Sequence, residues 1–220
     1  MKNKNNLLLH IMKFNFYALL ILFFTLSCND STSSTASNES NAASKLSGKY
    51  HFLEDTGAQV FLPIAFERYS LTKYQHLLDS LTTKKEYEIE SERLQSLSKM
   101  DGALYIYYNK EDGSTFTINT RPYFAFTKKD ATQLLGLITE NNDKVKENSD
   151  AKFTKITAKY GGDKNQQLFK TVYKVSGKSM KNDVYNSSYI ISSKGQTVFI
   201  QISTLKEVNF DPYLEKIILK

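Results

Sequence analysis

The sequence predicts an α+β fold in which an antiparallel sheet of about six to eight strands carries helices packed on it. Short runs rich in Val, Ile, Thr, Tyr and Phe recur along the chain, separated by turns that contain Gly and Asp, which is typical of antiparallel strands. Two longer stretches instead carry apolar residues at helical spacing. With 220 residues, of which 40% are hydrophobic and 13% aromatic, the chain is apolar enough to form a folded core.

The first expected element is a hairpin of strands 49–53 and 58–62, because an acidic, glycine-containing turn joins two apolar runs. Pro63 ends the second strand, since proline has no amide hydrogen to donate to a sheet ladder. Residues 66–99 then change to helical periodicity, with Ser70 as the expected N-cap.

Thr82 and Thr83 weaken this helical pattern, so we expect two helices, the second over residues 84–99. Strands 103–108 and 115–121 follow, joined by a turn of charged residues and glycine. Together these elements place two helices and a second hairpin after the opening one.

Pro122 ends that hairpin, and a helix is expected over residues 128–146. The last third predicts a four-stranded meander, then a short helix that begins at residues 211–212, where Pro suits a first turn. In one meander strand apolar residues alternate with Lys170 and Lys174, which predicts one packed face and one solvated face. The expected strands are 153–160, 168–175, 184–192 and 196–204.

Three of these features resemble the PsbP-like family, which includes Mog-type Ran-binding proteins and DcrB-type bacterial lipoproteins. They are the hairpin ending in Phe61-Leu62-Pro63, the tyrosine-rich meander, and the closing helix from Phe210 to Ile218. The resemblance covers residues 48–220. It implies an αβα sandwich and a non-enzymatic binding or assembly module.

The N-terminus is typical of a bacterial lipoprotein signal peptide, which we place at residues 1–27. Its lysines precede an apolar run over residues 14–26 that is short for a membrane-spanning helix. Cys28, the one cysteine of the chain, follows directly and resembles the lipobox cysteine that receives diacylglycerol. The alternative is a lone thiol beside an ordinary cleavage site. We expect lipidation of Cys28.

Residues 28–47 are expected to form the lipidated cysteine and a tether, because residues 29–44 contain no large apolar side chain. A flexible segment of this length spans about 20–25 Å, enough to hold residues 48–220 as a single domain near a membrane. Ser31, in Asp30-Ser31-Thr32, resembles a bacterial O-glycosylation acceptor. A chance match in a Ser/Thr tract is the alternative.

The charge of the chain argues against nucleic acid as a partner. The formal net charge is +6, but three of the 29 basic residues lie in the signal peptide. The three arginines, Arg68, Arg93 and Arg121, are far apart in sequence, whereas nucleic-acid binders cluster them with aromatic residues. With one cysteine and three histidines, we expect no metal site and no cofactor.

No catalytic motif is present: the chain lacks a P-loop, a Gly-x-Ser-x-Gly elbow and a His-Glu-x-x-His sequence. The acidic run Glu88, Glu90 and Glu92 is expected to face solvent. Aromatic side chains are the other notable feature. Those in the strand from Ala103 to Tyr108 are expected in the core, whereas Tyr123 and Phe124 are either core residues or a partner contact.

These observations predict an extracytoplasmic lipoprotein of the cell envelope that is not an enzyme and binds another envelope protein. Acylated Cys28 would insert into membrane lipid, in the outer membrane in preference to the inner, with the domain facing the periplasm or the cell surface. A small-ligand or envelope-stress sensor is the alternative, which a concave apolar pocket between sheet and helices would favour. A hydrolase would need His51 or His76 beside two carboxylates.

Overall fold

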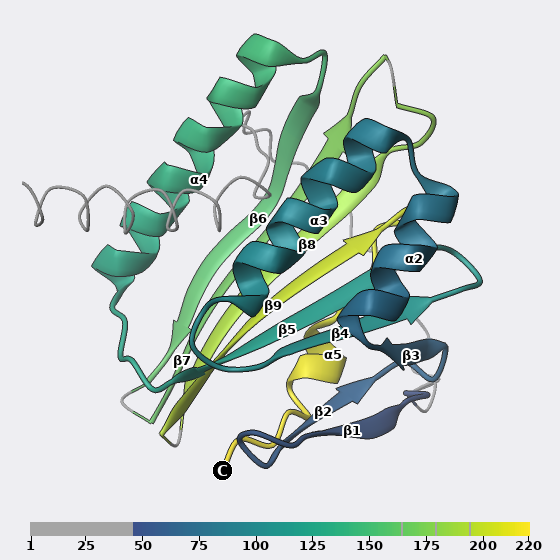
Figure 1. Ribbon diagram of the computed structural model, residues 1–220. Helices are drawn as coiled ribbons and strands as arrows, with labels where there is room; N and C mark the ends of the chain where they lie inside the picture. Colours follow the sequence, from purple (N-terminus) through teal and green to yellow (C-terminus); the bar gives the residue numbers. More distant parts are fainter. Residues whose placement is uncertain (1–45, 164, 179, 194) are drawn as a thin grey trace, which may run out of the picture.

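The computed structural model describes residues 46–163, 165–178, 180–193 and 195–220 (Figure 1). Its centre is a seven-stranded antiparallel sheet with the order β3-β4-β5-β9-β8-β7-β6, and β1 pairs with β2 in a separate hairpin. The strands are β1 (Lys49–Leu53), β2 (Ala58–Leu62), β3 (Phe66–Tyr69), β4 (Leu104–Asn109), β5 (Thr115–Pro122), β6 (Lys152–Gly162), β7 (Gln166–Ser176), β8 (Val184–Ser193) and β9 (Gln196–Thr204). The helices are α2 (Leu71–Leu81), α3 (Lys84–Ser98), α4 (Lys128–Asn148) and α5 (Asp211–Leu214).

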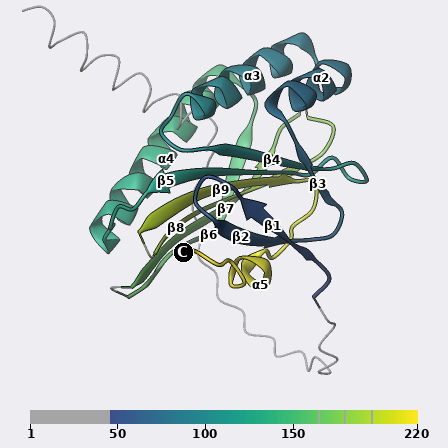
Figure 2. The ribbon, with the colours of Figure 1, turned by 60° about the horizontal axis from the view of Figure 1, so that its bottom comes forward.

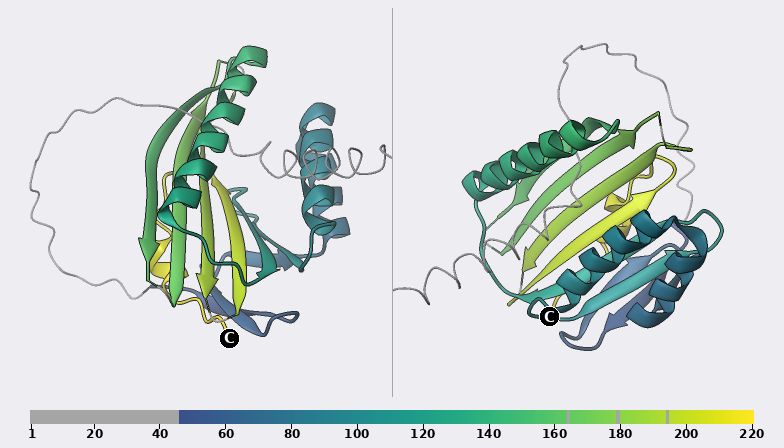
Figure 3. Two further views of the ribbon diagram at one scale, coloured as in Figure 1. Left: turned by 90° about the vertical axis from the view of Figure 1, so that its left-hand side faces the viewer. Right: turned by 45° about the horizontal axis from the view of Figure 1, so that its top comes forward.

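The elements form layers on the two faces of the large sheet (Figures 1 and 3). Helices α2, α3 and α4 lie on one face, whereas the β1–β2 hairpin and α5 lie on the other, as Figure 2 also shows. The predicted α+β class, with helices packed on an antiparallel sheet, is therefore confirmed.

Alternation along the strands divides the hydrophobic core between these layers, because successive side chains of a strand point to opposite faces. In β4, Tyr105 and Tyr107 pack under the hairpin and α5, whereas Ile106 and Tyr108 pack under α2 and α3. A third cluster joins α4 to strands β6, β7 and β8 around Ile138 and Phe169. The core position expected for the strand tyrosines is thus correct.

Side-chain caps set the helix starts. Ser70 caps α2 as expected, and its hydroxyl accepts a hydrogen bond from the Lys73 amide at 3.2 Å. Helix α2 ends at Thr82, whose hydroxyl and amide both donate to the Leu78 carbonyl. A capping box of Thr127 and Asp130 starts α4, which satisfies amide hydrogens that the first turn leaves unpaired.

The prediction of helix from residue 66 was wrong for its first four residues. Phe66–Tyr69 forms β3, an edge strand antiparallel to β4. Both of its apolar ends are buried, Phe66 in the core under the hairpin and Tyr69 in the core under α2. Two buried residues three apart match helical spacing as well as opposite faces of a strand, so only the pairing with β4 distinguishes them.

Candidate functional site

A cavity of about 570 Å³ lies between the meander strands and α5, within the range of small-molecule sites. Its apolar lining includes Leu168, Ile191 and Leu214, and its polar lining includes Asp163 and Glu215, both exposed. Gly161 keeps one wall open, since a Cβ there would meet no heavy atom within 4 Å. The full lining is Gly161, Gly162, Asp163, Gln166, Leu168, Tyr189, Ile191, Asp211, Leu214 and Glu215.

An ion pair fixes one wall of this cavity. The Lys170 ammonium, on β7, donates to both carboxylate oxygens of Asp211, at 2.7 and 2.8 Å. The Tyr189 hydroxyl, on β8, donates to Asp211 Oδ1 at 3.0 Å. Short helix α5 begins at Asp211, so its first residue connects it to two neighbouring strands.

The expectation that Lys170 lies on a solvated face was wrong. Lys170 is only 8% exposed, because α5 places the Asp211 carboxylate over that part of the sheet. A buried ammonium is tolerated only when it is paired and hydrogen-bonded, and here the carboxylate supplies both. Alternation predicted two faces correctly, but both faces are covered at this position.

The three groups are engaged with one another, and this decides what they can do chemically. Burial, with the Asp211 carboxylate adding to it, raises the pKa of Tyr189 well above its ordinary value, so the phenol stays protonated and donates. The Lys170 amine is occupied by its hydrogen bonds to both Asp211 oxygens. The wall therefore provides fixed shape and charge for binding and offers neither a free nucleophile nor a free base from these residues.

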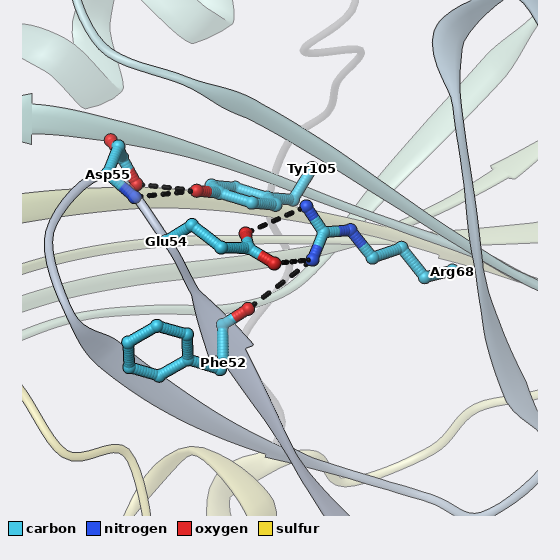
Figure 4. Close-up of polar contacts among 5 residues, drawn as sticks. All are labelled: Phe52, Glu54, Asp55, Arg68 and Tyr105. Atoms are coloured by element: carbon cyan, nitrogen blue, oxygen red, sulfur yellow. Dashed lines mark hydrogen bonds and ion pairs between the residues drawn. The ribbon is translucent and has the colours of Figure 1, made fainter.

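A polar cluster fixes the hairpin turn against the large sheet (Figure 4). Arg68 donates to the two carboxylate oxygens of Glu54 at 2.6 and 2.9 Å, and to the Phe52 carbonyl at 3.5 Å. The Tyr105 hydroxyl donates to Asp55 Oδ1 at 2.6 Å and accepts from the Asp55 amide at 3.2 Å. Bidentate Arg–carboxylate pairs fix geometry as well as charge, so this cluster holds the hairpin in one orientation.

Two of these groups have perturbed pKa values with clear causes. Hydrogen bonds from Arg68 lower the pKa of Glu54 to about 2. Burial, together with the hydrogen bond to Asp55, raises the pKa of Tyr105 to about 12. The Arg68 guanidinium also lies 4.6 Å from the Tyr105 ring centroid, in a cation–π contact. Arg68 therefore connects the Glu54 carboxylate of the turn to Tyr105 of the sheet.

Tyr123 and Phe124, the expected partner contact, lie in the connection from β5 to α4 and are 42% and 40% exposed. The Phe124 backbone is held at both ends: its amide donates to Thr197 Oγ1 at 3.2 Å, and its carbonyl accepts from Ser192 Oγ at 2.6 Å. Its ring stacks on Phe199 with centroids 5.8 Å apart. The pair is thus half-exposed and sits on the edge of the core.

A smaller cleft, of about 30 Å³, lies over β5, β8 and β9 beside Arg93 of α3. Arg93 is buried and donates to both Glu90 oxygens, and at 2.6 Å to Gln201 Oε1. The expectation that the acidic run faces solvent was therefore wrong for Glu90. Although burial opposes charge, the Glu90 carboxylate holds the pKa of Arg93 above its ordinary value.

The two histidines considered as catalytic candidates, His51 and His76, lie in elements on opposite faces of the large sheet. His51 packs edge-on against Tyr107 with ring centroids 4.7 Å apart, and His76 is exposed on α2. Within the described ranges no group of three or more His, Cys, Asp or Glu residues could hold a metal ion, and no helix is long and apolar enough to cross a membrane. Cys28 and Ser31 lie outside the described residues, as does nearly all of the 1–47 region.

The sequence does not predict that Lys170, Tyr189 and Asp211 contact one another. Asp211 was expected only as the start of a helix, and Tyr189 only as a strand residue. A lysine in the middle of a strongly apolar strand was the one available indication, since lysine is seldom buried unless paired.

Comparison with known proteins bears on the fold. No protein-family model and no curated protein matches the chain. The solution structure of cyanobacterial PsbP (CyanoP) from Synechocystis sp. PCC 6803 matches with a TM-score of 0.50 and 10% sequence identity, covering 83% of this chain and 98% of CyanoP. The fold is PsbP-like. The expected resemblance is thus confirmed for the fold.

A crystal structure from Bacteroides thetaiotaomicron VPI-5482 also aligns, at a TM-score of 0.33 and 13% identity, over 74% of this chain and 45% of that protein. That overlap is too low to support an argument. The PsbP-like domain of this chain therefore has to be interpreted functionally from its own residues.

Proposed function

We propose that this protein is a lipid-anchored, non-enzymatic binding module of a bacterial cell envelope. Acylation of Cys28 would hold it in the outer membrane in preference to the inner, and the PsbP-like domain would face the periplasm or the cell surface. Another envelope protein would be its partner. The observation that carries the binding function is the rigid, half-exposed aromatic pair Tyr123 and Phe124.

Rigidity matters because ordering a side chain on binding costs free energy. Phe124 should lose little conformational freedom on binding, because two hydrogen bonds already hold its backbone and its ring packs against Phe199. Aromatic side chains held in this way are typical of the few residues that dominate protein–protein affinity. Tyr123 lies beside it, and its amide donates to the Gly195 carbonyl at 3.2 Å.

The partner is tested by crosslinking in intact cells that express the full chain, followed by identification of the co-purified proteins. One recurrent partner is expected, and Tyr123→Ala should reduce its recovery at least fivefold. Leu81→Ala, an exposed apolar side chain of α2, is the matched control and should have no effect. Equal recovery from both variants would refute this contact surface.

Anchoring is tested separately. Wild-type protein should stay with membranes after a carbonate wash, and the mass of its N-terminal peptide should show acylated Cys28. Cys28→Ser should remove the acyl mass, and an unmodified wild-type Cys28 would refute the anchor. The same spectra test the proposed glycan on Ser31, which Ser31→Ala should abolish.

The cavity beside α5 favours a second function, the binding of a small ligand. Gly161→Phe should fill it without strain, because a Cβ at Gly161 meets open space. Native mass spectrometry of protein purified from its own cells should show a bound molecule in the wild type and none in Gly161→Phe. A ligand retained by Gly161→Phe, or none in the wild type, would reject this function.

A further inference from the structure

The outward side of the β1–β2 hairpin is exposed around Tyr50 and Phe52, whereas Phe61 on the same side is buried beneath Tyr50 and Tyr213. Its inward residues, such as Leu53 and Val60, are fully buried against the large sheet, whereas Tyr50 and Phe52 on the outward side are each 49% exposed. We call this outward side, together with the adjoining surface of α5 and the C-terminal segment, the hairpin face. Its residues are Tyr50, Phe52, Phe61, Tyr213, Lys216, Ile218 and Lys220.

Aromatic rings form a continuous row along the hairpin face. The Tyr50 and Phe61 ring centroids are 5.0 Å apart, and those of Phe61 and Tyr213 are 6.0 Å apart. Exposed Ile218 extends the row, because its backbone pairs with Gln59 of β2. Amphipathic aromatic side chains such as tyrosine favour the boundary between water and the apolar part of a bilayer.

Lysines surround this row. The Lys216 ammonium lies 5.0 Å from the Phe61 ring centroid, and the Lys220 ammonium lies 6.0 Å from that of Phe52. The neighbouring acid Glu54 is neutralised by Arg68, and Glu215 lines the cavity on another side of α5. The side-chain charge of the hairpin face is therefore positive, which complements anionic lipid headgroups.

The chain also enters the domain at this face. The Ser47 carbonyl accepts a hydrogen bond from the Tyr213 hydroxyl at 3.4 Å, and a Cβ at Gly48 would lie 2.7 Å from the Phe61 ring. About eighteen residues separate Cys28 from this point, and the tether predicted from the sequence would span about 25 Å. An acyl anchor at Cys28 would thus bring the hairpin face within reach of the bilayer.

The face is held rigidly relative to the rest of the molecule. Arg68 and Tyr105 fix the hairpin turn (Figure 4). Figure 2 shows the hairpin, α5 and the C-terminus on one side of the sheet, away from α2, α3 and α4. Docking by this face would therefore set the orientation of the whole domain and point the three helices away from the membrane.

We propose that the hairpin face docks on a membrane surface rich in anionic phospholipid, with Tyr50 and Phe52 entering the headgroup region. The lysines supply electrostatic attraction, and the aromatic row supplies burial at the interface. This inference rests on the proposed anchor only for bringing the face to the bilayer. It predicts an orientation that the anchor alone does not impose.

The test uses the full lipidated chain reconstituted into vesicles. A new cysteine is the one free thiol once Cys28 is acylated, so Tyr50→Cys and the control Leu81→Cys each accept one fluorophore. In phosphatidylcholine vesicles with 30% phosphatidylglycerol and brominated acyl chains, quenching should be at least threefold greater at position 50 than at position 81. Equal quenching at the two positions would overturn the proposal.

Charge is tested in the same assay. Each lysine near an anionic surface raises binding about fivefold, so replacing Lys216 and Lys220 by Glu should abolish the excess quenching at position 50. So should vesicles of phosphatidylcholine alone. Replacing the exposed Lys128 and Lys129 of α4 by Glu should leave it unchanged, and an equal loss there would refute a specific face.

Failure of the anchor is distinguishable from failure of docking. If Cys28 carries no acyl mass, the anchor is refuted. In that case, flotation of the labelled Tyr50→Cys protein with anionic vesicles would still support docking by the hairpin face. If Cys28 is acylated and position 50 is not preferentially quenched, the anchor stands and the docking proposal is wrong. Melting curves that match the wild type show that each variant is folded.

Discussion

The ion pair of Lys170 with Asp211 makes an asymmetric prediction, because its two members differ in burial. The side chain of Lys170 is 10% exposed and that of Asp211 is 37% exposed. Asp211→Ala leaves an ammonium in the core without its carboxylate, which costs about 3 kcal/mol of unfolding free energy, near the low end for a broken buried pair. Lys170→Met leaves a carboxylate that water can reach, at a cost of about 1 kcal/mol.

The double variant Lys170→Met/Asp211→Ala should recover most of the loss, because no charge is then left unpaired. Its expected destabilisation is about 1–1.5 kcal/mol, giving a coupling of about 2.5–3 kcal/mol between the two side chains. For a domain of this size about 1 kcal/mol shifts the melting temperature by 2–4 °C, so the single variants should differ by several degrees.

Urea denaturation followed by circular dichroism at pH 7 measures all four proteins of this cycle. Additive effects of the two substitutions, with a coupling below about 0.5 kcal/mol, would show that the pair does not interact as described. Equal destabilisation by both single variants would refute the assignment of the cost to the buried ammonium.

Three further predictions concern pH and glycine. Burial, with Lys49 adding to it, holds the pKa of His51 below 6.5, so the wild type should lose stability as pH falls below 6.5. In urea titrations at pH 5–7, His51→Phe should reduce this dependence of the unfolding free energy on pH. An unchanged pH dependence would contradict the prediction. Arg68 lowers the pKa of Glu54 from 4.5 to about 2, so the stability from this pair is present above pH 4.5 and is lost towards pH 2. In acid titrations at low salt, Glu54→Gln should lose less stability than the wild type between these pH values. An equal loss in the two proteins would exclude a contribution from the pair. In Gly136→Ala, in α4, the added Cβ meets no atom within 4 Å, so the variant should be more stable by about 0.5–1 kcal/mol. Gly102 has a φ of 93° and its added Cβ would lie 1.8 Å from a carbonyl oxygen, so Gly102→Ala should be less stable by more than about 2 kcal/mol. Similar melting temperatures for these two variants would be inconsistent with the backbone geometry.

Much of the fold could be predicted because its determinants are local. The opening hairpin, the N-cap at Ser70, the helix break at Thr82 and the four-stranded meander all follow from turn residues, caps and periodicity within short windows. The PsbP-like arrangement could be anticipated from the order of these elements. The predicted lipid anchor, from the apolar run and Cys28, likewise rests on local sequence alone.

The candidate sites could not be predicted in the same way, because long-range contacts create them. Strand β3 depends on pairing with β4 across about forty residues, and the cavity wall joins Lys170 to Asp211, forty-one positions apart. The aromatic row of the hairpin face needs Tyr213 beside Phe61, from opposite ends of the domain. Sequence by itself determined the elements other than β3 and predicts the anchor, since these depend on neighbouring residues. The tertiary structure decided which polar groups are buried in pairs and which aromatic groups are left exposed, since burial is a property of the assembled layers.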